Sequence, residues 1–120
     1  CGHGLQAALQ VWAMVQSVPE PGLAILTAGK RDVSYDIEMP IPAEWCRRGQ
    51  ATPQASPPSW KVSTMNDQHA YLRFNGDAVP QVGDRVGLGI SHPCTTFDKW
   101  RWMAVVNKHY DVVDAIVTYF

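Results

Sequence analysis

The sequence predicts a mostly β domain built as an antiparallel barrel or sandwich. Three observations lead to this fold class: apolar and polar residues alternate with a period of two in several stretches, turn residues separate these stretches, and no stretch has the pattern of a long helix. The chain has 120 residues, the size of one domain, so we expect residues 1–120 to form a single β domain. About seven strands in a unit of this size is typical of antiparallel barrels and sandwiches.

The first half of the sequence predicts a hairpin followed by irregular chain. Residues 9–18, LQVWAMVQSV, alternate, and residues 23–29, LAILTAG, have β-type composition, with the turn sequence PEPG between them. Residues 30–42 are polar and contain prolines, which indicates an irregular connection with at most one short strand, over 33–35. Residues 47–59, RRGQATPQASPPS, are rich in Pro, Gly and small polar residues, and we expect a flexible loop there.

The second half predicts three strands and a closing hairpin. Residues 60–66 and 69–74 have strand composition, and residues 85–90, RVGLGI, alternate so that two glycines share one face. Glycines inside a strand indicate a bulge or the close approach of another backbone. Residues 99–107 and 112–120 are rich in aromatic and β-branched residues, so we expect them to form a hairpin that closes the domain.

Composition excludes several classes of function. The net charge is -1 and the basic pairs are isolated, which argues against a nucleic-acid surface. The longest apolar run is too short to cross a bilayer, and three widely spaced cysteines argue against a disulfide framework. We therefore expect a soluble, cytoplasmic protein. Because the chain begins with Cys1 and not with Met, we expect a fragment of a longer protein or a processed product.

The stretch GLGISHPCTTFDKW holds the candidate metal ligands, His92 and Cys94. Residues two apart on a strand share a face, and imidazole and thiolate are good zinc ligands. Two ligands leave coordination positions open, so a metal here would act as a Lewis acid and not as a structural staple. The ordinary alternative is a buried cysteine beside a hydrogen-bonded histidine. His69 is a candidate third partner of the pair. The ordinary alternative is that His69 is an exposed or turn histidine.

Four separated blocks, in order, carry a family resemblance: AILTAGKRDVSYD, NDQHAYL, VGDRVGLGISHPCTTFDKW and VTYF. Together they resemble the C-terminal domain of the D-serine dehydratase and D-threonine aldolase family, most closely its bacterial D-serine deaminase or amino acid deaminase branch. The resemblance implies that His92 and Cys94 match the family's His-x-Cys metal motif, with zinc or another divalent metal. It implies that Gln68 and His69 fall on the family's Glu-His position, so Gln68 departs from the pattern. We name His69 and Tyr35 as candidate catalytic residues.

The resemblance also implies the rest of an enzyme. Members of the family have the alanine-racemase arrangement, in which an N-terminal barrel binds pyridoxal phosphate and a β domain completes the active site. The N-terminal pyridoxal-binding barrel is absent from this chain, so we expect the chain alone to be inactive. The implied activity is that of a D-amino-acid deaminase, in which a metal assists loss of the β-hydroxyl from a small D-amino acid such as D-serine. The full-length enzyme would be a homodimer.

Three alternatives stay open from the sequence. A D-threonine aldolase-type enzyme would use the same cofactor and metal but break the Cα–Cβ bond. A non-catalytic β-barrel could serve as an interaction or oligomerisation module, with His92 and Cys94 merely buried. A third possibility is a family member that keeps the fold but has lost the metal.

Overall fold

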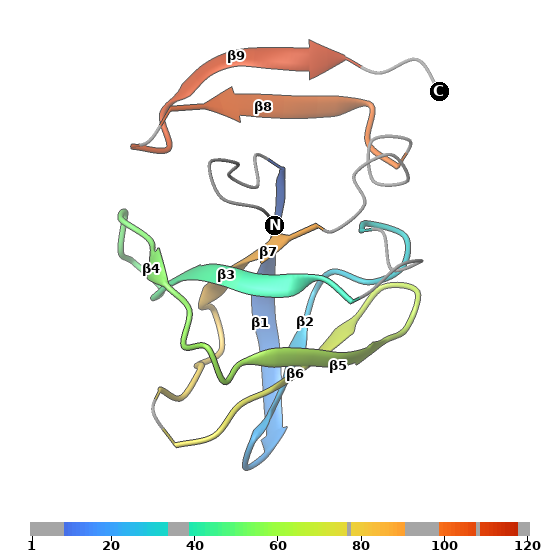
Figure 1. The fold of residues 1–120 in the computed structure, drawn as a ribbon, viewed down its shortest axis with the longest axis vertical. Coiled ribbons are helices and arrows are strands. Elements are labelled where there is room, and N and C mark those ends of the chain that lie inside the picture. The colour runs from blue at the N-terminus through green and yellow to red at the C-terminus, as the bar shows by residue number, and fades with distance from the viewer. Residues whose placement is uncertain (1–8, 34–38, 77, 91–98, 108, 118–120) are drawn as a thin grey trace.

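The protein consists of a curled antiparallel sheet with a separate hairpin beside it (Figure 1). The computed structural model describes residues 9–33, 39–76, 78–90, 99–107 and 109–117. The strands within these ranges are β1 (Gln10–Glu20), β2 (Leu23–Leu26), β3 (Ile41–Cys46), β4 (Gln54–Ala55), β5 (Lys61–Met65), β6 (Ala70–Arg73), β7 (Arg85–Gly89), β8 (Trp102–Val106) and β9 (Val112–Val117). All strand pairs are antiparallel, which confirms the predicted mostly β class.

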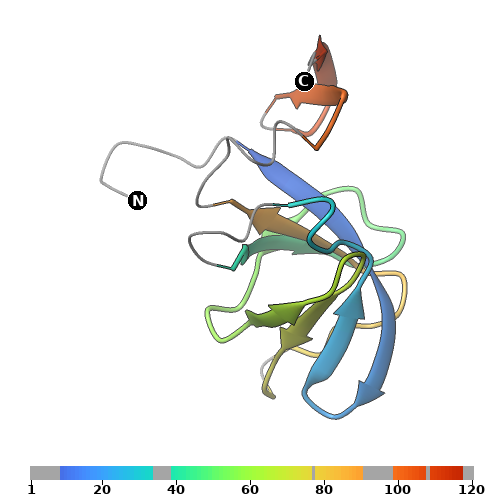
Figure 2. The same ribbon diagram turned by 90° about the vertical axis from the view of Figure 1, so that its right-hand side faces the viewer.

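Seven strands form one sheet in the order β4-β3-β7-β1-β2-β6-β5. The sheet curls so far that β5, at one end, contacts β3, the second strand from the other end. The rings of Trp45 in β3 and Trp60 just before β5 meet at this contact, with centroids 5.3 Å apart. The result is a half-barrel whose concave side holds the core (Figure 2).

Alternation along the strands decides which residues fill this core. Val11, Ala13 and Val15 of β1 are buried, while Met14 and Gln16 between them are exposed. Successive side chains of a strand point to opposite faces, so the predicted period of two is confirmed here. The buried apolar residues of the core are Val11, Ala13, Val15, Ala24, Leu26, Ala28, Val33, Trp45, Trp60, Val62, Met65, Ala70, Leu72, Val86 and Leu88.

At Gly87 of β7 the cause differs from the one predicted, whereas at Gly89 the nearest atom to a Cβ is the backbone carbonyl oxygen of Ile41, at 3.6 Å. Gly87 pairs with Trp12 of β1, and a Cβ atom at Gly87 would lie 2.8 Å from the Trp12 ring. An aromatic side chain, and not a second backbone, therefore occupies the space above the glycine. The bulge of this region lies in β3, where Ala43 is the extra residue between the pairs that Pro42 and Glu44 make with β7.

Two strands lie where the sequence predicted irregular chain. β3 includes residues 41 and 42, which we expected to be part of a connection, and it pairs with β7 along its length. β4 lies inside the stretch 47–59 that we expected to be a loop, because Ala55 pairs with Glu44 of β3. Val33 is buried in a bend and does not begin a strand, and residues 34 and 35 lie outside the described residues.

The predicted C-terminal hairpin exists as β8 and β9, but it does not close the half-barrel. It forms its own two-stranded sheet beyond the end of β1 that begins at Gln10 (Figures 1 and 2). Two hydrogen bonds hold it there: Trp100 Nε1 donates to the Asp32 carbonyl at 2.7 Å, and Tyr110 Oη donates to Glu44 Oε1 at 2.5 Å. Within the described ranges, no helix is long and apolar enough to cross a membrane.

Candidate functional site

Two chain segments are held together at one end of the sheet, and they carry His69. The first is the turn after β2, and the second is the connection between β5 and β6. Lys30 N donates to the Asn66 carbonyl and Arg31 N donates to the Asp67 carbonyl, both at 2.9 Å. These backbone bonds fix the basic residues of one segment against the turn that precedes His69.

Gly29 makes this close approach possible. A Cβ atom at Gly29 would lie 2.4 Å from the Asn66 carbonyl oxygen, 2.5 Å from His69 N and 2.6 Å from Gln68 N. No real side chain fits at such distances from backbone atoms, so the position requires glycine for packing. The Asp32 carboxylate accepts from Gly29 N at 3.0 Å and closes the same turn.

His69 lies half-buried at this junction and contacts β1. Its Nε2 atom is 3.0 Å from Oε1 of Gln16, whose side chain is exposed. Thr27 lies beside them: its hydroxyl accepts from Met14 N at 2.9 Å. The three polar side chains therefore come from three neighbouring parts of the sheet.

Two adjoining open cavities, of about 520 and 370 Å³, surround His69. They share Arg31, Gln68 and His69, and we call the combined space the His69 cleft. Its charged lining has both signs, from Lys30, Arg31, Asp32 and Asp67. A polar, solvent-open cleft with an imidazole and long basic side chains is suited to bind a small zwitterion and to exchange protons with it.

The other predicted site residues cannot be placed beside His69 from this structure. Tyr35, His92 and Cys94 lie outside the described residues. The described chain on either side of 91–98 ends at Ile90, which packs against the core, and resumes at Lys99. Trp100, two residues after this segment, is bonded to the Asp32 carbonyl, which belongs to the turn at the His69 cleft.

The described residues contain no group of three or more His, Cys, Asp or Glu side chains that could hold a metal ion. Cys46 is a buried free cysteine. Its thiol donates to the Gln50 carbonyl at 3.0 Å and lies 3.8 Å from Nη2 of Arg85. Cys46 is therefore accounted for by packing and hydrogen bonding.

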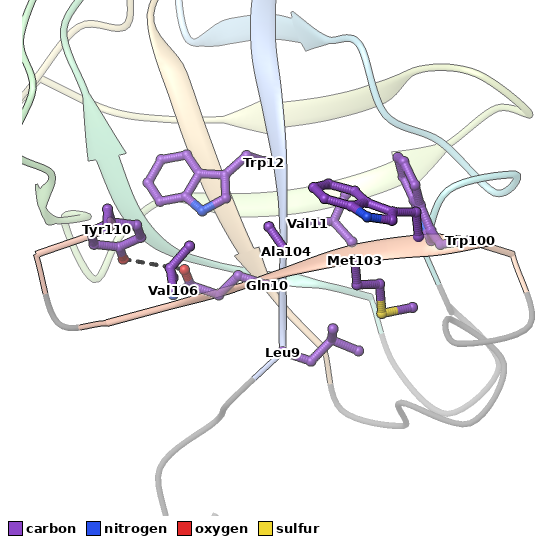
Figure 3. A pocket seen from close by; sticks show the side chains of 10 residues that line it. Leu9, Gln10, Val11, Trp12, Trp100, Met103, Ala104, Val106 and Tyr110 are labelled. Carbon is purple, nitrogen blue, oxygen red and sulfur yellow. Dashed lines mark hydrogen bonds between the residues drawn. The ribbon is translucent and has the colours of Figure 1, made fainter. Parts of the chain in front are cut away.

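A second cavity, of about 340 Å³, lies between the hairpin and β1 (Figure 3). Trp12 and Tyr110 lie at one end of it, and Trp100 and Met103 lie at the other. Trp12 and Tyr110 pack edge to face with centroids 5.7 Å apart. The lining is apolar and aromatic, so this space is suited to packing and not to proton transfer.

Tyr110 is the polar end of this apolar cavity. It has a positive φ of 64°, in the turn between β8 and β9, and its hydroxyl also lies 3.3 Å from Gln10 Oε1. Burial, followed by the hydrogen bond to Glu44 and the negative charge of Glu44, raises the pKa of Tyr110 from its ordinary value to about 12. The neutral phenol is therefore the form that holds the hairpin.

Sequence reasoning named His69 but missed Gln16, Thr27 and Trp100. Gln16 and Thr27 are single polar residues in or after a strand, and the only local signal is their exposed position in the alternation. Their meeting with His69 depends on the order of β1, β2 and β6 in the sheet, which the local sequence does not encode.

Comparison with known proteins identifies two similarities. The family model described as "Putative serine dehydratase domain" matches residues 8–106, a span that includes positions 35, 69, 92 and 94. The crystal structure of D-threonine aldolase from Filomicrobium marinum is similar with a TM-score of 0.65 and 26% sequence identity. That match covers 81% of this chain and 23% of the aldolase chain, so the present chain spans less than a quarter of its solved relative. No curated protein sequence matches the chain significantly.

Proposed function

The chain belongs to the serine dehydratase domain family, and we propose that it is the C-terminal, metal-binding domain of a pyridoxal-phosphate-dependent D-amino-acid deaminase of the D-serine dehydratase type. The observation that carries this proposal is the family match over residues 8–106, together with a polar cleft around His69 within that span. Membership of this family supports the assignment of the chain as a domain of a pyridoxal-dependent lyase. Deamination of a D-amino acid, as the particular reaction, is our inference.

His69 is the residue of this chain that we assign to proton transfer. It is half-buried, its backbone is fixed by the neighbouring turn, and the cleft around it is open to a substrate. Histidine is the side chain that most readily accepts and returns a proton near neutral pH. Arg31 lines both parts of the cleft and is suited to attract the substrate carboxylate. We keep Tyr35 as a second candidate on the resemblance alone.

His92 and Cys94 are the proposed metal ligands. The imidazole and thiolate donors suit zinc better than they suit magnesium or calcium, which prefer oxygen. A zinc ion held there would supply a Lewis acid for the substrate's β-hydroxyl. Trp100 attaches the chain that follows this pair to the turn at the His69 cleft, which supports a shared site.

Pyridoxal phosphate would be held by a second part of the enzyme, where it would supply the electron sink for the substrate's α-carbon. The hairpin is the surface that we propose for docking that part. Six of the eleven exposed large apolar residues among those described lie in it, and Trp100 directly precedes it; the six are Trp102, Val106, Val112, Val113, Ile116 and Val117. Such a concentration is typical of an interface. The aldolase relative has more than three quarters of its chain outside the match, which is the part of a longer protein that could cover the hairpin.

One alternative reaction has a specific observation in its favour. The solved relative is a D-threonine aldolase, so the domain could serve a retro-aldol enzyme that breaks the Cα–Cβ bond. The products distinguish the two reactions. A deaminase converts D-serine to pyruvate and ammonia, and an aldolase converts D-threonine to glycine and acetaldehyde.

The metal assignment is tested on the chain itself. We expect the purified chain to bind zinc in a one-to-one ratio, measured by elemental analysis after dialysis, and the double variant His92→Ala, Cys94→Ala to lose it. The matched control is Cys46→Ala, which removes a buried, hydrogen-bonded thiol that is not one of the proposed ligands and should keep the zinc. Equal zinc content in the double variant and the parent chain would refute the assignment.

A further inference from the structure

The contact between His69 and Gln16 fixes which ring nitrogen can act as a base. Nε2 of His69 is 3.0 Å from Oε1 of Gln16. A carboxamide oxygen only accepts hydrogen bonds, so Nε2 must carry the hydrogen in this contact. In the neutral ring the lone pair is then on Nδ1, for which the described residues provide no hydrogen-bond partner.

The position of Gln16 in β1 explains why it reaches His69. Val15 pairs with Leu26 and Ser17 pairs with Ile25, so Gln16 is the extra residue of a β-bulge. Bulges redirect a side chain and occur frequently beside active sites. β2 lies between β1 and β6 in the sheet, so the Gln16 side chain crosses the end of β2 to meet His69.

We propose that Gln16 is a positioning residue that holds His69 in the Nε2–H tautomer, so that Nδ1 accepts the proton in the His69 cleft and returns it. This inference rests on the proposed role of His69 in proton transfer. The charged side chains that line the same cleft, Lys30, Arg31, Asp32 and Asp67, include both signs and favour neither tautomer as a group. The Asp32 carboxylate accepts from Gly29 N, whereas Gln16 Oε1 is the side-chain acceptor that lies 3.0 Å from Nε2 of His69.

The test is nitrogen NMR of the 120-residue chain with labelled histidine, at an alkaline pH where imidazoles are neutral. The His69 signals are assigned by their loss in His69→Gln. In the parent chain we expect Nε2 near the protonated limit and Nδ1 near the unprotonated limit. In Gln16→Ala the two resonances should move toward each other, because the hydrogen bond to Gln16 no longer adds to the preference for the Nε2–H form.

Two more variants separate hydrogen bonding from packing. Gln16→Glu keeps an accepting oxygen and should keep the parent pattern, whereas Gln16→Lys offers only a donor and should move the proton to Nδ1. The internal control is His109, an exposed turn residue whose signals should not move in any variant. If Gln16→Ala fails to fold, the Glu and Lys variants decide the question.

A parent chain with the proton on Nδ1, or a Gln16→Lys spectrum identical to that of the parent, would overturn the inference. The spectra depend on the ring and its partner and not on turnover. If the spectra show the expected Nε2–H tautomer but the enzyme does not turn over D-serine, the proposed function is rejected. The role of Gln16 in setting the tautomer then still stands.

Discussion

Gly29 sets the distance between the two segments that form the His69 cleft. The three backbone atoms closest to its missing side chain belong to Asn66, Gln68 and His69. This residue has no positive φ, so it is required by space and not by backbone conformation. Alanine can adopt the backbone conformation of Gly29, but its methyl group does not fit in the space between the two segments.

We predict that Gly29→Ala lowers the free energy of unfolding by about 2–3 kcal/mol, since backbone atoms must move to admit one methyl group. Urea denaturation of the chain measures the change. Gly76→Ala is the matched control, because a Cβ atom there meets nothing within 4 Å. The control should stay within about 0.5 kcal/mol of the parent chain. Equal stability of the two variants would contradict the packing account.

Asp84 is the buried acidic residue of the core and the second residue on which stability depends. It is 1% exposed and accepts hydrogen bonds from Arg47 Nη1, Arg48 N and Gln81 N at 2.9, 3.2 and 2.9 Å. These bonds join the chain after β3 to the turn before β7. The buried carboxylate therefore relies on these three donors in place of water.

We predict that Asp84→Ala lowers the free energy of unfolding by about 3 kcal/mol, because it leaves these donors without their charged acceptor. Glu20→Ala is the comparison, since Glu20 makes an exposed ion pair with Arg73 at 3.5 Å and should contribute less than about 1 kcal/mol. Thermal and urea unfolding of both variants measure the difference. A smaller loss for Asp84→Ala than for Glu20→Ala would show that burial does not decide the contribution.

At the scale of elements, the hairpin β8–β9 depends on a few polar anchors. A two-stranded hairpin is marginally stable by itself, and β9 is exposed along its whole length. The Tyr110 hydroxyl, bonded to Glu44, is one of the anchors that hold it against the half-barrel. Since the pKa of Tyr110 is raised to about 12, folding favours the protonated phenol.

The raised pKa predicts an alkaline loss of hairpin attachment. The stabilisation is complete below the ordinary tyrosine pKa of about 10 and disappears as the pH rises through about 12. Tryptophan fluorescence during an alkaline titration measures it, because Trp12 contacts Tyr110. Tyr110→Phe should remove this transition and lower stability at neutral pH. Tyr71→Phe, which removes an exposed hydroxyl, should leave the transition in place; a transition that survives Tyr110→Phe would disprove the assignment.

The elements also show what the sequence can and cannot predict. Alternation located β1 and β7, and β-type composition located β2 and both strands of the hairpin, although β9 is exposed along its whole length. β3 was missed because Pro42 and the bulge at Ala43 interrupt its alternation, and its strand state depends on pairing with β7. Gln16 was missed for the same kind of reason, since only the bulge and the sheet order direct it toward His69.

At the scale of the molecule, the described residues of the half-barrel form an apolar core, whereas the hairpin leaves apolar surface exposed. The hairpin is joined through Trp100 to the turn that lines the His69 cleft. A partner that covers the hairpin would therefore lie next to the cleft. This arrangement supports our proposal that the active site is shared between this domain and a pyridoxal-binding part.

The most direct measurement of the central claim is turnover of D-serine by the enzyme formed from this domain and its pyridoxal-binding part, with and without His69→Gln. If His69 transfers the proton, kcat should fall by about 10²–10⁴-fold while the fold and bound pyridoxal phosphate are retained. The control Thr27→Ala changes the cleft lining but leaves the imidazole, and it should keep most of the activity. Pyruvate release at the parent rate by His69→Gln would contradict the claim.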